Sequence, residues 1–147
     1  MTPGSTHPLR ITRRFDASPE RLFDAWLDPT IARQWLFSSP GADLAARRVE
    51  IDPRVGGKRL MTNQHQGVEI LGLGEYLEID RPRRLVFTFA IPQFSPDFDR
   101  IVVEIVSEGS GSLLTLTHEK LPPEFHDATE SGWLEMFETL DGVLGRQ

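Results

Sequence analysis

Hydrophobic and polar residues alternate over most of the chain between residues 9 and 118. From Leu9 to Phe15 every second residue forms one face, which is apolar except at Arg13. This period of two predicts a β-strand over 9–16 with one buried face. Similar short runs, separated by turns rich in Gly, Pro and Asp, predict further strands at 44–52, 57–65, 68–79, 84–91, 99–107 and 112–118.

Three other segments have the period of an α-helix. Ser18 is a typical cap, and Pro19 fits the first position of a helix that continues to Leu27. Asp28-Pro29-Thr30 ends it, and a second short helix is expected over Ile31 to Phe37. After Leu121-Pro122-Pro123 a long helix is expected, with Asp127 or Thr129 as its cap. Its apolar stripe consists of Trp133, Met136, Phe137, Leu140, Val143 and Leu144.

The predicted order is therefore one strand, two short helices, six strands and a long helix. Strands joined by short turns pair antiparallel, because parallel neighbours need long crossovers. A sheet that curls around the last helix buries both apolar surfaces. We expect an α+β fold in which a curved antiparallel sheet of about seven strands grips a long C-terminal helix. Residues 9–147 are predicted to form one domain, and residues 1–8 a flexible tail.

Composition narrows the classes of function. The 147 residues include no cysteine, which excludes a disulfide framework, a thiolate nucleophile and a Cys-based zinc site. Asp and Glu outnumber Lys and Arg by 22 to 16, and this net charge of −6 argues against binding to nucleic acid or anionic membranes. No apolar run reaches the roughly 20 residues of a membrane span, and residues 1–8 lack the features of a signal peptide. We expect a cytoplasmic protein, either a monomer or a small oligomer such as a homodimer.

Several segments also carry the resemblance to a known family. They are Phe15 to Pro29 followed by Trp35, Asp52 to Gly57, Gly74 to Pro82, Leu85 to Thr88, and Leu114 to His118 ahead of Gly132-Trp133. In this order they resemble the START-like (SRPBCC) helix-grip superfamily, and more narrowly the branch related to the activator of the heat-shock protein 90 ATPase. The resemblance covers residues 9 to 145 and implies an elongated apolar cavity between the sheet and the C-terminal helix.

The resemblance does not decide the activity, because the superfamily includes ligand carriers, cyclases and hydrolases. The second, larger domain of the chaperone activator has no counterpart in these 147 residues. A function in chaperone activation is therefore not carried over to this chain.

The predicted strand 57–65 is polar on both faces. One face carries Lys58, Leu60, Thr62 and Gln64, and the other carries Arg59, Met61, Asn63 and His65. Polar groups that turn inward need a partner, water or a ligand. This indicates either a cavity or a strand end that extends beyond the helix into solvent. Phe87, Phe89, Trp133 and Phe137 are expected to converge, as ordinary core or as an aromatic-lined pocket.

Three charged or titratable residues have two possible roles each. Glu75 faces inward with Leu71, Leu73, Leu77 and Ile79 if strand 68–79 keeps one register, and outward if Gly72 or Gly74 forms a bulge. An inward Glu75 would have a raised pKa and could act as acid, base or ligand anchor. His118, on a face with Leu114 and Leu116, is either a core residue or part of a site. An inward Arg47 would favour an anionic or carboxylate-bearing ligand.

Other motifs lack the context that their chemistry needs. Gly56-Gly57-Lys58 and Gly72-Leu73-Gly74 lead into strands, so they are neither a phosphate loop nor a dinucleotide fingerprint. The four histidines have no metal-ligand spacing, and no serine lies in a GxSxG motif. We expect no metal and no cofactor.

Three functions follow from these observations. The first is binding of a small, largely apolar molecule (lipid or polyketide-like) between the sheet and the last helix. Its predicted lining is Trp35, Met61, Asn63, His65, Glu75, Phe87, Phe89, His118, Trp133 and Phe137. The second is a protein-interaction module that uses Phe94 and Phe98 on a surface loop. The third is an enzyme in which Glu75 pairs with His65 or His118 as acid and base.

Overall fold

A computed structural model describes residues 8–39, 41 and 43–145, except for the side chain of His65. The predicted tail lies almost wholly outside these residues. The strands are β1 (Leu9–Phe15), β2 (Val49–Ile51), β3 (Lys58–His65), β4 (Val68–Asp80), β5 (Arg84–Phe89), β6 (Asp99–Glu108) and β7 (Gly111–His118). The helices are α1 (Pro19–Leu27), α2 (Pro29–Trp35) and α3 (His126–Gly145), with short 3-10 turns at Leu44–Ala46 and Pro123–Phe125.

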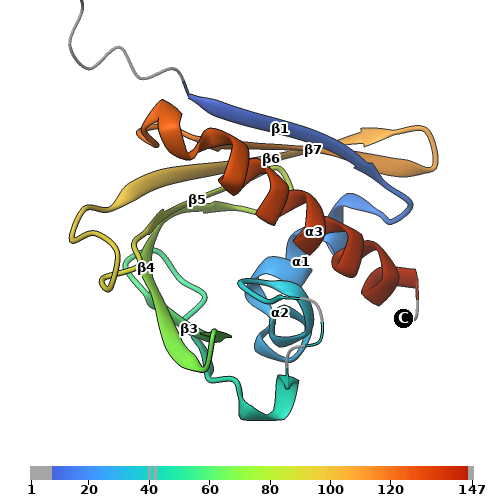
Figure 1. The fold of residues 1–147 in the computed structure, drawn as a ribbon. Coiled ribbons are helices and arrows are strands. Elements are labelled where there is room, and N and C mark those ends of the chain that lie inside the picture. Colours follow the sequence, from blue (N-terminus) through green and yellow to red (C-terminus); the bar gives the residue numbers. More distant parts are fainter. Residues whose placement is uncertain (1–7, 40, 42, 146–147) are drawn as a thin grey trace, which may run out of the picture.

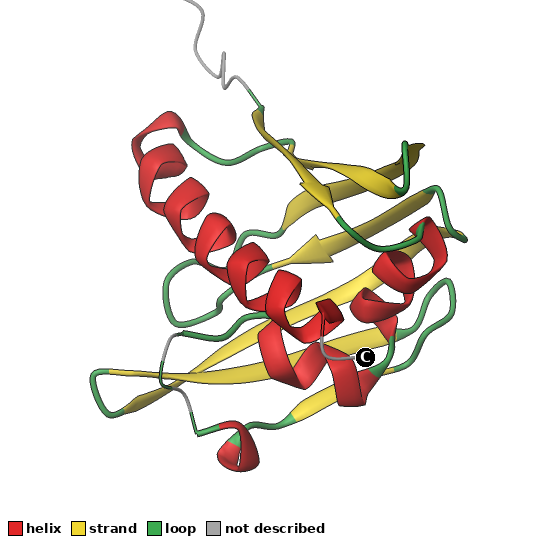
Figure 2. Cartoon of the chain, turned by 90° about the vertical axis from the view of Figure 1, so that its right-hand side faces the viewer, coloured by secondary structure: helices red, strands yellow, loops and turns green. Residues whose placement is uncertain are grey.

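The seven strands form one antiparallel sheet in the order β1-β7-β6-β5-β4-β3-β2. The sheet bends strongly through β4 and encloses the helices on its concave side (Figure 1). There α3 runs across the sheet next to β1, α1 packs against β6 and β7, and α2 lies between α3 and the edge strand β2 (Figures 1 and 2). This arrangement confirms the predicted α+β helix-grip fold.

Local sequence explains where the helices begin. The Ser18 side chain accepts a hydrogen bond from the backbone of Arg21 at 3.2 Å and caps α1. Asp28 caps α2 in the same way, so this helix begins at Pro29, two residues earlier than expected. The predicted caps of α3 are wrong: the helix begins at His126, directly after the 3-10 turn, and therefore includes Asp127 and Thr129.

The predicted strand 44–52 is wrong in its first half. Asp43 accepts a hydrogen bond from the backbone of Ala45 and stabilises a 3-10 turn over Leu44–Ala46. Such local bonds from an Asp side chain compete with a sheet ladder. Only Val49–Ile51 then pairs with β3, as the edge strand β2.

The register of β4 excludes an inward Glu75. Ile70, Gly72, Gly74 and Tyr76 are buried on the concave face, and the residues between them face outward. A bulge does occur, but it lies after Tyr76: Tyr76 opposes Phe87, whereas Glu78 opposes Val86. Alternation already places Leu77 on the outer face, and the bulge returns Ile79 to the inner face, opposite Leu85.

An aromatic cluster fills the space between α3 and the sheet. The rings of Trp26 and Trp35 meet edge to face at 4.8 Å between centroids, and those of Trp133 and Phe137 lie 5.6 Å apart. Phe87 joins the cluster through Trp26 at 6.2 Å. The residues predicted to line a cavity under α3 therefore pack mainly against one another.

Arg13, which interrupts the apolar face of β1, has partners on α3. Its guanidinium bonds to Glu138 at 2.5 Å, lies 3.8 Å from Asp141, and covers the ring of Phe15 at 4.6 Å. The side chain therefore connects β1 to α3 at the rim of the core, where its charge is paired.

Candidate functional site

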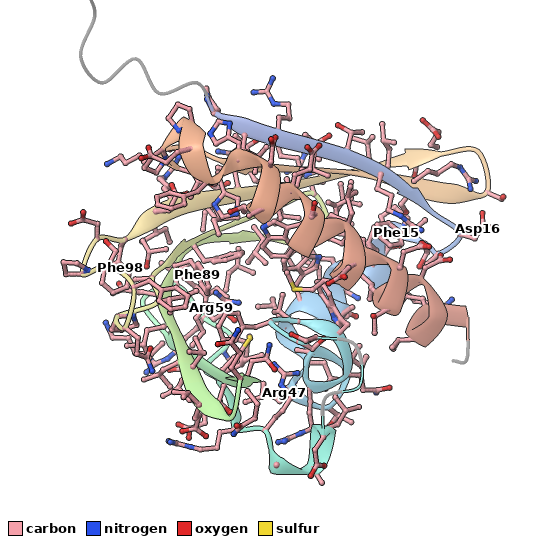
Figure 3. The ribbon with its side chains drawn as sticks, viewed as in Figure 1. Phe15, Asp16, Arg47, Arg59, Phe89 and Phe98 are labelled. Atoms are coloured by element: carbon pink, nitrogen blue, oxygen red, sulfur yellow. The ribbon has the colours of Figure 1, made fainter. Side chains whose placement is uncertain are left out.

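Arg59 of β3 reaches into the concave side of the sheet, near Phe89 (Figure 3). Its side chain is 5% exposed. The guanidinium carbon lies 4.1 Å from the ring centroid of Phe87, 5.9 Å from that of Tyr76 and 6.0 Å from that of Phe89. Nη2 has one weak contact, to Met61 Sδ at 3.7 Å. Arg59 is thus a cation held among aromatic rings and a thioether.

No carboxylate balances this cation. None of the ion pairs within the described part of the chain includes Arg59, and the remaining residues contain no Asp or Glu. Burial lowers the pKa of Arg59, and the nearby hydroxyl of Tyr76 acts in the opposite direction. Desolvating an ion in a protein costs several kcal/mol, while a buried cation–π contact returns about 2 kcal/mol. The aromatic rings therefore offset only part of the penalty.

Three buried donor groups around Phe87 have no hydrogen-bond partner: Arg59 Nε, Tyr76 Oη and Trp26 Nε1. We call Arg59, Tyr76 and Trp26 the donor cluster. The Phe87 ring lies 6.2 Å from that of Trp26 and 6.3 Å from that of Tyr76. Burial raises the pKa of Tyr76, which keeps its hydroxyl protonated at neutral pH. Since buried donors are normally paired, this cluster is suited to a ligand or water that supplies acceptors.

Two glycines of β4 make room for these side chains. A Cβ on Gly72 would lie 2.9 Å from the Phe89 ring, and one on Gly74 would lie 1.9 Å from the Thr88 carbonyl oxygen and 3.2 Å from Arg59 Cδ. The Gly72-Leu73-Gly74 motif therefore serves close packing on the inner face of the sheet.

Phe37 and Phe89 lie at the margin of this region. Both are partly exposed, and their rings meet edge to face at 5.7 Å. Phe37 has a φ of 55°, a left-handed conformation that is strained for a bulky residue. The pair forms a boundary between the aromatic surroundings of Arg59 and the surface.

Arg47 is also buried, as one of the sequence alternatives held, but its donors are occupied. Nε donates to the Thr62 carbonyl at 2.9 Å and Nη2 to the Phe37 carbonyl at 3.0 Å, and further bonds reach the carbonyls of Leu36 and Arg33. Burial and the charge of Arg33 lower the pKa of Arg47 to about 10. Its role is to attach the end of α2 to β3, so it does not provide the anion site that an inward Arg47 suggested.

The structure brings some predicted site residues together and separates others. Trp35, Phe87, Trp133 and Phe137 belong to the aromatic cluster, while Met61 and Phe89 lie beside Arg59. Asn63 bonds to Ser39 Oγ at 2.9 Å at the edge of a recess of about 210 Å³. The side chain of His65 lies outside the described residues.

His118 has two partners that fix its tautomer. Nδ1 lies 2.7 Å from Asp99 Oδ2, and Trp133 Nε1 donates to Nε2 at 2.7 Å. Because an indole nitrogen only donates, Nε2 carries no proton and Nδ1 donates to Asp99. His118 therefore connects β6, β7 and α3 as a neutral, fully bonded side chain.

Glu75 lies on the opposite face of the sheet from His118. It forms an ion pair with Lys58 at 2.8 Å. It opposes Lys58 on β3, whereas His65 lies at the other end of that strand, opposite Val68. The acid–base pair on which the enzyme hypothesis depended is therefore not assembled.

A recess of about 730 Å³ opens on the outer side of the sheet. Leu60, Leu73 and Glu75 line it, Arg59 and Gly74 also reach it, and Phe98, which is 50% exposed, lies at its margin. Figure 3 shows Phe98 across the sheet from Arg59. Neither this recess nor the one beside Asn63 lies between the sheet and α3, where the resemblance implied a cavity.

Sequence reasoning missed Arg59 and Tyr76 as site residues. Arg59 was only one member of a mixed strand face, and the register of strand 68–79, which decides the orientation of Tyr76, was left open. The available signal was the pair Gly72 and Gly74, since glycines in a strand mark a close approach by other groups. They oppose Met61 and Arg59 on β3.

Within the part of the chain that the structure covers, no group of three or more His, Cys, Asp or Glu side chains could hold a metal ion. The helices in the same part are too short or too polar to cross a membrane.

Comparisons with known proteins agree with this fold. Residues 16–145 match the family described as Activator of Hsp90 ATPase homolog 1-like protein. The chain matches no protein with curated annotation. It is similar to protein CV1439 from Chromobacterium violaceum, with 25% identity, a TM-score of 0.83, and coverage of 97% of this chain and 98% of that one. A protein from Rhodobacter sphaeroides has 22% identity, a TM-score of 0.80 and coverage of 99% and 97%. CalU16 from Micromonospora echinospora has 24% identity, a TM-score of 0.67 and coverage of 93% and 75%.

Proposed function

The chain belongs to the Activator of Hsp90 ATPase homolog 1-like family, with its START-like helix-grip fold, and from this premise we propose that it binds a small, largely hydrophobic molecule inside the grip. The site is the donor cluster and the rings around it. The observation that carries the proposal is the set of buried, unpartnered donors beside Phe87. In a core whose only role is to stabilise the fold, buried donors are normally paired with acceptors, and these three are not.

The chemistry of the lining supports a mostly apolar ligand. Phe87, Phe89 and Met61 offer ring and thioether surface to any molecule next to Arg59. Ligand sites in proteins are typically apolar with a few placed polar groups, which describes this combination. Phe89 is partly exposed, and covering its ring adds at most roughly 1.5–3 kcal/mol of hydrophobic stabilisation, whereas Phe87 and Met61 are already buried.

Access is expected at the Phe37–Phe89 pair. Both rings are partly exposed, and the strained backbone of Phe37 favours an alternative conformation of this residue. Binding then requires this pair to separate, because the aromatic cluster under α3 is closely packed. The two side chains act as a boundary that a ligand displaces.

The test is a titration of the full chain with neutral and acidic apolar molecules, followed by tryptophan fluorescence and calorimetry. Amide NMR spectra then locate the site: we expect shifts at Arg59, Tyr76 and Phe89. The matched control is Phe98→Ala, which removes an aromatic ring from the opposite side of the sheet and should leave the affinity unchanged. Absence of binding across the panel, or shifts at Lys58, Leu60, Leu73 and Phe98 without shifts at Tyr76 and Phe89, would refute the proposal.

A second candidate function is association through the outer recess, and the exposure of Phe98 favours it. The occupant it favours is a second copy of this chain, because the rim carries both Lys58 and the acids Glu50 and Asp52. A two-fold interface needs such self-complementary charges. Light scattering on the wild type and on Phe98→Ser tests this: a dimer that the substitution dissociates supports it, and a monomeric wild type refutes it.

A further inference from the structure

Arg59 presents one edge of its guanidinium without a matching acceptor. Nε has no partner, and Nη2, on the same edge, has only the thioether of Met61 at 3.7 Å. These two nitrogens form the planar fork that binds a carboxylate through two parallel hydrogen bonds. The unpaired edge is therefore the one that bidentate recognition uses.

We propose that this edge of Arg59 binds the carboxylate of a hydrophobic acid, with Tyr76 Oη as a further donor. This inference rests on the proposed function and specifies its ligand class. One guanidinium balances one negative charge, and the neighbouring groups are aromatic rings and a thioether rather than further cations. A dianionic phosphate would keep an unbalanced charge in this apolar environment, whereas a monocarboxylate would not.

The comparison of the two buried arginines supports this assignment. Arg47 reaches four backbone carbonyls and has a structural role within the chain. Arg59 reaches none, although it is equally buried. Arg59 also lies on β3 opposite Gly74, where a side chain would approach its Cδ to 3.2 Å. The glycine thus leaves room for an arginine whose charge has no ion-pair partner among the described residues.

The test compares acids with their neutral counterparts. The probes are naphthoic and decanoic acids and the primary amides of both, which keep the apolar body and remove the charge. At neutral pH the wild type is expected to bind each acid at least about tenfold more tightly than its amide, as a charge-assisted pair implies. Arg59→Met should reduce this ratio to about one, and Arg59→Lys, which keeps the charge but not the fork, should give an intermediate value.

Two controls separate a specific site from general charge attraction. Lys58→Met removes a cation at the adjacent position, whose side chain is 78% exposed on the opposite face of β3. It should leave the acid-to-amide ratio unchanged. Tyr76→Phe should lower the ratio about three- to tenfold, because it removes one donor.

A spectroscopic readout does not depend on the variants. In the wild type, the Arg59 Nε–H proton resonance should move downfield when an acid is added and stay in place with the amide.

The possible outcomes are distinct. If acids and amides bind equally well, the hydrophobic site stands and the carboxylate assignment is wrong. If neither binds, the proposed function fails, and this inference fails with it. If Lys58→Met abolishes the preference and Arg59→Met does not, the acid binds at the outer surface and the assignment is refuted.

Discussion

Replacing each buried arginine by methionine should change stability in opposite directions. Arg59→Met removes a desolvated charge and an unpaired donor, while methionine keeps most of the apolar contacts of the stem. Arg47→Met removes the nitrogens that donate hydrogen bonds to the carbonyls of Thr62, Leu36 and Phe37. The two variants make the same chemical change at two similarly buried sites of one chain.

The magnitudes follow from these contacts. For Arg59 the relief of several kcal/mol of desolvation exceeds the loss of about 2 kcal/mol of cation–π attraction to Phe87. We expect Arg59→Met to raise the free energy of unfolding by about 1–3 kcal/mol. For Arg47 the charge is removed as well, but buried carbonyls lose their partners, and we expect a decrease of about 3–5 kcal/mol.

Urea unfolding in the absence of ligand measures both changes, and calorimetry should show a shift of about 3 °C per kcal/mol in the melting temperature. Equal slopes of the urea transitions are needed, so that the change reflects stability rather than a different unfolded state. A loss of stability in Arg59→Met comparable to that in Arg47→Met would refute the reasoning. It would show that the chain itself satisfies the Arg59 guanidinium.

The remaining predictions concern one ionisation, one packing contact and one tautomer. Tyr76 is the only tyrosine, and burial raises its pKa above the ordinary 10.0. Tyrosinate absorbance should therefore develop at higher pH in the folded than in the denatured chain, and higher still in Arg59→Met, because the cation favours the phenolate. Since the unfolded phenol ionises first, stability should fall as pH rises above 10.0; equal midpoints in both states would contradict this. Gly74→Ala should lower the free energy of unfolding by about 3 kcal/mol, because the new Cβ clashes with a carbonyl of β5. Gly132→Ala, in open space on α3, should raise it by about 1 kcal/mol. Urea unfolding measures both changes, and equal changes in the two variants would contradict the prediction. For His118, nitrogen NMR should find the proton on Nδ1, and a proton on Nε2 would exclude the hydrogen bonds described.

The fold was predictable because its signals are local. Alternation identifies most of the strands, and the Ser18 cap and the break at Asp28-Pro29-Thr30 place α1 and α2 within two residues. The failures also have physical causes. Asp43 stabilises a turn where alternation suggested a strand, and the bulge after Tyr76 places Leu77 and Ile79 on opposite faces, where one register would have placed them together. A single sequence does not show which register wins when both faces of a strand carry apolar residues.

The candidate site was less predictable, because it depends on which polar groups remain unpaired. Arg47 and Arg59 both lie on predicted strands, 44–52 and 57–65, and the sequence does not show what surrounds either side chain. Only the fold shows that carbonyls from α2 and β3 surround Arg47 and that aromatic rings surround Arg59. His118 shows the same limit: its bonds to Asp99 and Trp133 identify it as a structural residue.

The two halves of the grip therefore differ in how many of their buried polar groups have hydrogen-bond partners. Beneath α3, the polar groups of His118, Trp133 and Trp35 have partners, through Asp99–His118–Trp133 and the bond of Trp35 to the Ala25 carbonyl, and Trp26 Nε1 is the exception among the described residues. Towards β3 to β5, donors remain unpaired. A buried donor without an acceptor lowers stability. The well-packed half beneath α3 must therefore contribute most of the free energy of unfolding. A ligand is therefore expected to bind in the half that contains unpaired donors. An acceptor on the ligand gains the most binding free energy there, because the donors are already desolvated and in position.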